Sequence, residues 1–144
     1  MGAATAMILA AGRGERMRPL SDTTPKPLLA VAGKPLVVHQ IEALARAGHR
    51  DIAINASHLA QTLVDALGDG LAFGVRLAWS IEPEPLEAAG GIATARGLLA
   101  DGPVLVVSGD VWSEYDYTKL EPMRTRIGRE QRRAAHLVMV PNPP

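Results

Sequence analysis

Two glycines and three arginines stand close together in the first part of the chain. Gly12 and Gly14 carry no Cβ, so their backbone N–H groups can come close to phosphate oxygens. Arg13, Arg16 and Arg18 add positive charge, and a guanidinium can hold a phosphate through two parallel N–H bonds. These residue types at this spacing predict a loop that binds a polyphosphate.

A lysine between two prolines follows the loop. Pro25 and Pro27 remove local backbone freedom, and Pro27 favours an extended backbone at Lys26. A lysine restrained in this way is expected to direct its ammonium group at a fixed target. The polyphosphate bound by the neighbouring loop is the expected target.

Other interpretations of the glycine pair remain open. Two glycines after a strand can form a plain turn. The pair could also begin a dinucleotide-binding fingerprint, but Met17 stands where that motif has its third glycine. The phosphate loop of the P-loop NTPases ends in Gly-Lys-Ser or Gly-Lys-Thr, and the sequence contains neither tripeptide.

Strand-like and helix-like stretches alternate along the chain, which predicts an α/β fold with a mostly parallel sheet flanked by helices. The run at 104–107 is strongly apolar, so we expect this strand in the centre of the sheet. Ser57 is the expected N-cap of a helix. The expected strands cover 6–9, 51–55, 75–80, 104–107 and 135–140, and the expected helices cover 36–47, 57–67 and 90–99.

An aspartate, Asp110, follows the strand expected at 104–107. Ligands of parallel α/β sheets bind at the carboxyl ends of the strands, where the loop at 12–18 also falls. We therefore expect Asp110 and the loop to share one site. An aspartate in this place can be a turn residue, but it is also a candidate ligand for Mg²⁺, which prefers carboxylate and phosphate oxygens.

The composition limits the possible functions. The 144 residues are expected to form one domain (1–144), and 15 Lys plus Arg balance 15 Asp plus Glu. We therefore expect no binding to nucleic acid or to a membrane, and aromatic residues, at 3%, are too few for base stacking. Without cysteine the chain has neither disulfides nor thiol catalysis, and it shows no signal-peptide pattern. We expect a cytoplasmic protein that is a monomer or a weak homo-oligomer.

The string at 9–20, followed by Pro25-Lys26-Pro27, resembles the signature of the sugar-1-phosphate nucleotidyltransferases, Leu-Ala-Ala-Gly-x-Gly-x-Arg-Met-x-Pro-Leu and then Pro-Lys-Pro. Every fixed position of the signature is present. Further stretches resemble most the uridylyltransferases of this family that act on N-acetylmuramate 1-phosphate in peptidoglycan recycling. These stretches are 84–92, 108–112 and 136–143.

The resemblance implies a Rossmann-like nucleotidyltransferase fold, with Mg²⁺ as cofactor and UTP and a sugar 1-phosphate as substrates. It also implies a role for each matching residue. The implied catalytic residues are Arg16, Lys26 and Asp110, with Asp110 as the metal ligand. The nucleoside would contact Ala10, Ala11 and Gly12, and the triphosphate would contact Gly14, Glu15 and Arg16. Gly90 and Ser108 would lie beside the base and the ribose.

Two alternatives to uridylyl transfer stay open under this resemblance. The chain could transfer a thymidylyl or guanylyl group to a hexose or heptose phosphate, or it could be a catalytically silent nucleotide-binding domain. The family continues well past position 144, with acceptor-sugar contacts and a second metal-binding aspartate. We therefore expect the chain to be a C-terminally truncated, nucleotide-binding part of a nucleotidyltransferase domain.

Overall fold

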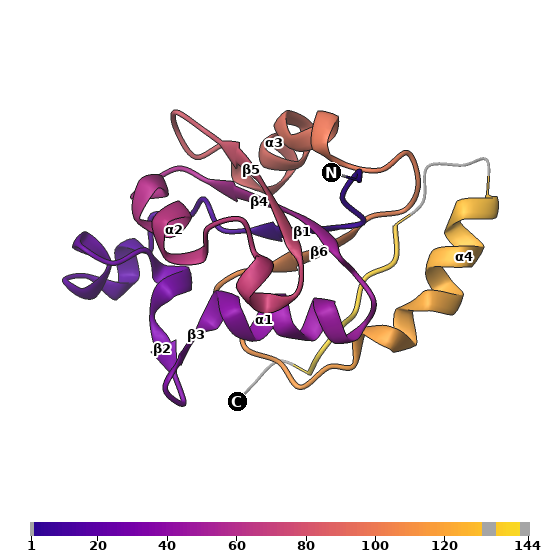
Figure 1. Ribbon diagram of the computed structural model, residues 1–144, viewed down its shortest axis with the longest axis horizontal. Coiled ribbons are helices and arrows are strands. Elements are labelled where there is room, and N and C mark those ends of the chain that lie inside the picture. The colour runs from indigo at the N-terminus through magenta and orange to yellow at the C-terminus, as the bar shows by residue number, and fades with distance from the viewer. Residues whose placement is uncertain (1, 131–134, 142–144) are drawn as a thin grey trace.

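The computed structural model describes residues 2–130 and 135–141. Its centre is a parallel sheet with the strand order β5-β4-β1-β6 (Figure 1). The carboxyl ends of the strands coincide, since Leu9 at the end of β1 lies opposite Asn55 of β4 and Ser108 of β6. The four strands are β1 (Ala6–Leu9), β4 (Asp51–Ala56), β5 (Arg76–Ile81) and β6 (Leu105–Ser108).

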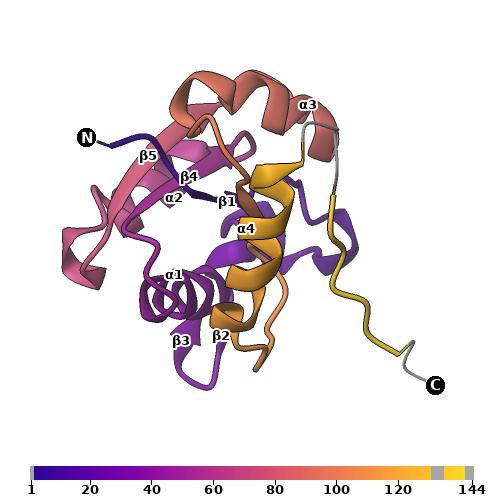
Figure 2. The same ribbon diagram turned by 90° about the vertical axis from the view of Figure 1, so that its right-hand side faces the viewer.

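Four α-helices and a small antiparallel hairpin complete the described fold. In Figure 2, which looks at the right-hand side of Figure 1, α4 lies in front of the sheet, and in Figure 1 it lies at the end of the molecule away from the hairpin. The helices are α1 (Leu36–Arg46), α2 (Ala60–Leu67), α3 (Glu87–Thr94) and α4 (Glu121–Arg129), and the hairpin strands are β2 (Ala30–Val31) and β3 (Lys34–Pro35). Short 3-10 helices cover 15–17, 20–22, 26–28, 71–73, 95–98 and 117–120.

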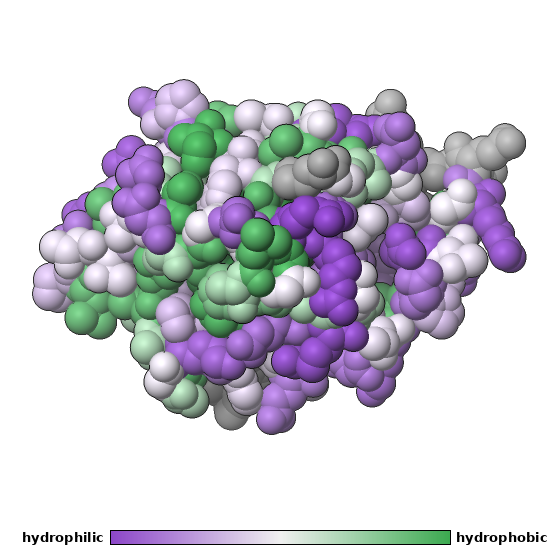
Figure 3. Space-filling view, in the orientation of Figure 1, coloured by the Kyte–Doolittle hydropathy of each residue, from purple (hydrophilic) through white to green (hydrophobic). Residues whose placement is uncertain are grey.

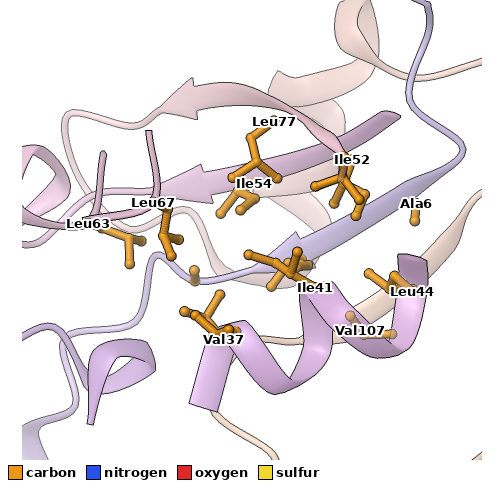
Figure 4. Packing of buried hydrophobic residues seen from close by; sticks show 14 of the residues in the cluster. Ala6, Val37, Ile41, Leu44, Ile52, Ile54, Leu63, Leu67, Leu77 and Val107 are labelled. Atoms are coloured by element: carbon orange, nitrogen blue, oxygen red, sulfur yellow. The ribbon is translucent and has the colours of Figure 1, made fainter. Parts of the chain in front are cut away.

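Side chains of β1 alternate between the two faces of the sheet, as the twofold repeat of a strand requires. Ala6 and Ile8 pack with α1 and α2 in one apolar cluster (Figure 4). Met7 packs on the other face, in the cluster that the segment 92–99 covers. The helices therefore cover both faces, and all three of these side chains are fully buried.

Helix α1 supplies one wall of the larger cluster. Val37, Ile41 and Leu44 recur at helical spacing and are fully buried (Figure 4). Burial of each such side chain contributes roughly 1.5–3 kcal/mol to stability. The helix ends where the N–H of Gly48, in the left-handed region at φ 92°, donates to the Ala45 carbonyl at 3.1 Å.

The expected α/β architecture is confirmed, whereas several expected details are wrong. The apolar run near 104–107 forms a strand, but within the described residues β6 pairs with β1 alone and lies at an edge, where Val106 is 38% exposed. An apolar run indicates a strand but does not give the place of that strand in the sheet. The short helix expected at 90–99 begins at Glu87 and continues as a 3-10 helix to Leu98.

The strand expected at 135–140 is absent: residues 135–141 form no regular structure. Leu137, Met139 and Val140 are more than 70% exposed, because the segment finds no strand to pair with among the described residues. The Pro-rich end at 142–144 lies outside the described residues. Ser57 is not the N-cap of α2, since the helix begins at Ala60 and its N-cap is Leu59.

Hydrophilic residues are interspersed with smaller hydrophobic groups on the face shown in Figure 3. Within the described part of the chain, every helix is too short or too polar to cross a bilayer.

Candidate active site

The loop after β1 begins in the core. Ala10 and Ala11 are 6% and 8% exposed, so the start of the loop is held rigidly under the surface. The Ala10 N–H donates to Oδ1 of Asn55, the residue in β4 opposite Leu9, over 2.8 Å. The first turn of the loop is therefore fixed by a side chain from the neighbouring strand.

Gly14 has the backbone conformation that favours glycine, with φ at 63°. A Cβ at this position would lie 3.1 Å from Cβ of Lys26 and 3.2 Å from Cβ of Ser21. The Ser21 hydroxyl donates to the Gly14 carbonyl at 2.7 Å and closes the loop. Glycine at this position thus allows the loop to pack directly against Lys26.

Lys26 begins a single turn of 3-10 helix, Lys26–Leu28, so the expected extended backbone is wrong. Pro27 fits in the first turn of this helix because no partner is needed there for a backbone N–H. The extended residue is Pro25, with ψ at 134°. The turn is closed by the Leu28 N–H, which donates to the Pro25 carbonyl at 2.8 Å.

Lys26 and Asp110 form an ion pair across the site, with 2.6 Å between Nζ and Oδ2. Their side chains are 27% and 31% exposed, so water reaches both. Asp110 follows Gly109, whose N–H donates to the Leu9 carbonyl at 2.9 Å. The carboxyl ends of β1 and β6 thus bring the lysine and the aspartate to one place, as expected of a parallel sheet.

A cavity of about 640 Å³ opens between these segments, within the size range of small-ligand sites. Two cations, Arg16 and Lys26, and the glycine backbone face it, so it suits an anion with several phosphates. Its lining residues are Leu9, Ala10, Gly12, Gly14, Glu15, Arg16, Met17, Lys26, Pro27 and Asp110.

Seven of the ten residues to which the resemblance assigns a role line this cavity, and three do not. Arg13 and Arg18, also expected to add positive charge, are not among the lining residues. Ala11 is buried beneath it, and Ser108 lies at the same sheet edge beside Leu9. Gly90 lies in α3, outside the lining. The roles assigned to all ten residues stay predictions.

A buried polar network that was not predicted from the sequence joins the loop after β1 to the loop after β5 through the end of β4. Asn55 and Glu82 are each 2% exposed, and the Asn55 amide donates to Glu82 Oε1 at 2.7 Å. Glu82 Oε2 accepts from the Leu86 N–H at 3.1 Å, and Gly91 lies against both side chains. Their place in the sequence could have pointed to them, since Asn55 and Glu82 are polar residues at the carboxyl ends of two expected strands that prove to be neighbours.

The donors at the site fit a hydrated Mg²⁺ bound together with phosphates. Within residues 2–130 and 135–141, no three His, Cys, Asp or Glu side chains gather into a metal cluster. Asp110 offers one carboxylate at the cavity wall. Mg²⁺ usually keeps several waters and binds one or two carboxylates plus substrate phosphates, so a single aspartate is compatible with this mode.

The fold and the cavity define a Rossmann-like α/β protein whose glycine- and arginine-containing loop lines a cavity at the carboxyl edge of its sheet. The chain belongs to the Nucleotidyl transferase family, whose sequence model matches residues 5–142. It is 54% identical over 140 residues to the N-acetylmuramate alpha-1-phosphate uridylyltransferase of Neisseria meningitidis, covering 96% of this chain and 60% of the relative. It is 40% identical over 128 residues to a mannose-1-phosphate guanyltransferase of Schizosaccharomyces pombe, covering 87% and 35%.

Solved structures agree with this family. A putative glucose-1-phosphate thymidylyltransferase of Bacillus anthracis superposes with a TM-score of 0.78 at 26% identity, covering 85% of this chain and 50% of that one. HddC of Yersinia pseudotuberculosis, solved with GMP-PN, superposes with a TM-score of 0.73 at 29% identity, covering 83% and 53%. The resemblance identified from the sequence is thereby confirmed.

Proposed function

We propose that the chain belongs to an enzyme that transfers a uridylyl group from UTP to N-acetylmuramate 1-phosphate, giving UDP-N-acetylmuramate and pyrophosphate. The observation that carries this proposal is the 54% identity to the Neisseria uridylyltransferase. The guanyltransferase of S. pombe is more distant, at 40%. The proposal includes a cytoplasmic reaction in peptidoglycan recycling.

In the proposed reaction a phosphate oxygen of the sugar 1-phosphate attacks the α-phosphorus of UTP. A bond forms between this oxygen and the α-phosphorus, and the bond from the α-phosphorus to the oxygen that bridges to the β-phosphorus breaks. The electron pair leaves with pyrophosphate. The nucleophile is already an anion, so the protein needs no general base and acts by alignment and charge neutralisation.

The residues at the cavity can supply both effects. Arg16 and Lys26 offer positive charge to the phosphates, and the backbone at Gly12 and Gly14 offers close N–H donors. Lys26 would exchange its ion pair with Asp110 for a phosphate when the nucleotide binds. Glu15 carries a negative side chain, so its contact with phosphate would come from its N–H.

We propose that Asp110 would hold Mg²⁺ at the site. When bound, the ion neutralises phosphate charge and orients the triphosphate. Asp110 lies at the end of β6 and faces Lys26 across the cavity, so it is placed to keep positive charge near the phosphates.

Calorimetric titration with nucleotides tests the proposal on the chain itself. We expect UTP with Mg²⁺ to bind more tightly than GTP, and Arg16→Ala to weaken UTP binding by roughly tenfold or more, as expected for the loss of a charged hydrogen bond. Arg129→Ala, a matched change on the exposed helix α4, should leave the affinity unchanged. Tighter binding of GTP would replace the proposal with guanylyl transfer, and binding of no nucleotide would overturn it.

A further inference from the structure

We propose that Gln40 is a positioning residue for Asp110, holding the loop that carries this aspartate in the orientation that favours Mg²⁺. The inference rests on the proposed function, in which Asp110 holds the ion. Gln40 lies in α1 and does not line the cavity.

Gln40 is a polar residue on the buried face of α1, only 3% exposed among apolar neighbours. Its Nε2 donates to the Val111 carbonyl, and its Oε1 accepts from the Tyr117 hydroxyl at 2.6 Å. A carbonyl can only accept, so the amide orientation is fixed by Val111. Burial raises the pKa of Tyr117, which keeps its hydroxyl protonated and able to donate to Gln40.

Asp110 is bracketed by two anchors of the backbone. On one side the Gly109 N–H donates to the Leu9 carbonyl of β1 at 2.9 Å, and on the other side the Val111 carbonyl accepts from Gln40. The backbone around Asp110 is thus tied both to the sheet and to α1. Without the Gln40 hydrogen bond, only the Gly109 anchor to the sheet would remain.

Apolar packing does not replace this anchor. The side chains of Val111 and Trp112, which follow Asp110, are each 51% exposed. The next hydrogen bond along the loop is local, from the Tyr115 N–H to the Ser113 hydroxyl at 3.0 Å. The Gln40 amide therefore provides the long-range contact nearest to Asp110 on its C-terminal side.

Two roles of Gln40 make different predictions. If Gln40 only stabilises the fold, its loss lowers the affinity for UTP by the same factor with Mg²⁺ and with EDTA. If Gln40 positions Asp110, its loss weakens binding mainly in Mg²⁺ and lowers the ratio of the two affinities. Loss of a residue that orients a metal ligand typically weakens metal affinity by about 10–100-fold.

The test compares calorimetric Kd values for UTP in Mg²⁺ and in EDTA for wild type and Gln40→Met, which keeps length and removes the amide. We expect Gln40→Met to lower the Mg²⁺ enhancement of binding by roughly tenfold or more. Gln61→Met, a matched change at an exposed glutamine of α2, should leave the enhancement unchanged. If Gln40→Met does not fold, Gln40→Leu gives the answer, since it removes the amide and introduces no polar group that could bond the Val111 carbonyl.

The outcomes separate this inference from the proposed function. An enhancement that is present in wild type, lost in Asp110→Asn and retained in the Gln40 variant overturns the positioning role alone. No enhancement in wild type, or an enhancement retained in Asp110→Asn, overturns the metal role of Asp110 and the inference with it.

Discussion

Lys26 and Asp110 lie far apart in the sequence, yet their side chains meet in an ion pair at 2.6 Å. Both are about 30% exposed, and a pair that water reaches contributes about 0–1 kcal/mol to stability. A contribution to stability therefore does little to explain why these two residues are present. A lysine and an aspartate at the wall of a cavity that also holds Arg16 are better explained by binding of phosphate and a cation.

Lys26→Ala tests the role of the lysine. We expect the mutation to weaken UTP binding by roughly tenfold or more, because one charged hydrogen bond contributes about 1.5–3 kcal/mol, and to slow uridylyl transfer by about 10²–10³-fold. Calorimetry and pyrophosphate release measure the two effects. Lys34→Ala is the matched control, since Lys34 pairs with Glu42 away from the cavity. Equal affinity and activity in both variants would remove Lys26 from the site.

Asp110→Asn tests the metal role. Asparagine keeps the shape of the side chain and loses the negative charge that attracts a hard cation, so UTP binding should lose its dependence on Mg²⁺. The Asp110→Asn variant should still bind UTP in EDTA, more weakly than wild type binds UTP with Mg²⁺. Asp101→Asn, at an aspartate whose side chain is 98% exposed, should behave as wild type. An unchanged Mg²⁺ requirement in Asp110→Asn would contradict the assignment.

Among the secondary-structure elements, the carboxyl ends of β1, β4 and β5 hold the site together through hydrogen bonds. The Asn55 side chain of β4 accepts from the Ala10 N–H and donates to Glu82, and Glu82 also accepts from the Leu86 N–H. The loops after β1 and β5 are thus bonded together through β4 at the sheet edge. A buried polar network of this kind is stable only when each group has a partner.

Gly91→Ala should break this network. An added Cβ would lie 2.5 Å from Asn55 Nδ2 and 2.9 Å from Glu82 Oε1, too close for either atom. We expect the free energy of unfolding to fall by roughly 1–3 kcal/mol, measured by urea denaturation. Gly97→Ala, where an added Cβ meets nothing within 4 Å, should change it by less than about 0.5 kcal/mol. Equal stabilities of the two variants would show that the loops tolerate the crowding.

His49 links the end of α1 to β1 and predicts a pH dependence. Burial, and next the positive charge of Arg124, hold the pKa of His49 below its ordinary value of 6.5, while its ring nitrogen lies 2.9 Å from the Thr5 hydroxyl. Below pH 6.5 the unfolded chain therefore binds a proton before the folded one, so stability falls as the pH falls toward the lowered pKa.

His49→Gln should flatten this part of the stability curve, measured by urea denaturation over a pH series. His39→Gln is the matched control, since that ring contacts the Val31 carbonyl elsewhere. A wild-type slope that persists in His49→Gln would assign the pH dependence to another group.

Local patterns predicted most of the elements and the centre of the site. The helix at 36–47 and the strands at 6–9 and 51–55 follow from spacing that each segment carries by itself, and the structure reproduces them within a residue or two. Two of the errors are non-local. The edge position of β6 and the missing strand at 135–140 depend on which partner a strand finds, which no local pattern contains.

The same distinction holds within the site. The loop glycines and Arg16 are predicted because they stand close together in the sequence, whereas Gln40 and Glu82 form hydrogen bonds with residues distant in the sequence. Lys26 was predicted as a site residue but with the wrong backbone, because a turn closed by the Pro25 carbonyl outweighs the usual preference before a proline.

At the scale of the whole molecule, the chain spans 60% of the length of the Neisseria relative and 35% of the S. pombe relative. We expect the 144-residue chain, tested by itself, to bind UTP and to release little pyrophosphate with N-acetylmuramate 1-phosphate. The cavity lies between the loop after β1 and Asp110, whereas the resemblance assigns most acceptor contacts to later positions. If the sugar 1-phosphate is not held in line with the α-phosphorus, the reaction loses the rate gain that comes from a bound and aligned nucleophile. Rapid turnover by a chain of verified mass would contradict this expectation.

A crystal structure of the chain with Mg²⁺ and a non-hydrolysable UTP analogue would show whether this cavity binds the triphosphate. We expect the triphosphate in the cavity lined by Gly14, Arg16 and Lys26, with Lys26 Nζ moved from Asp110 to a phosphate oxygen and the ion beside the Asp110 carboxylate. A triphosphate bound outside this cavity, or bound with the Lys26–Asp110 pair intact and no ion at Asp110, would contradict it.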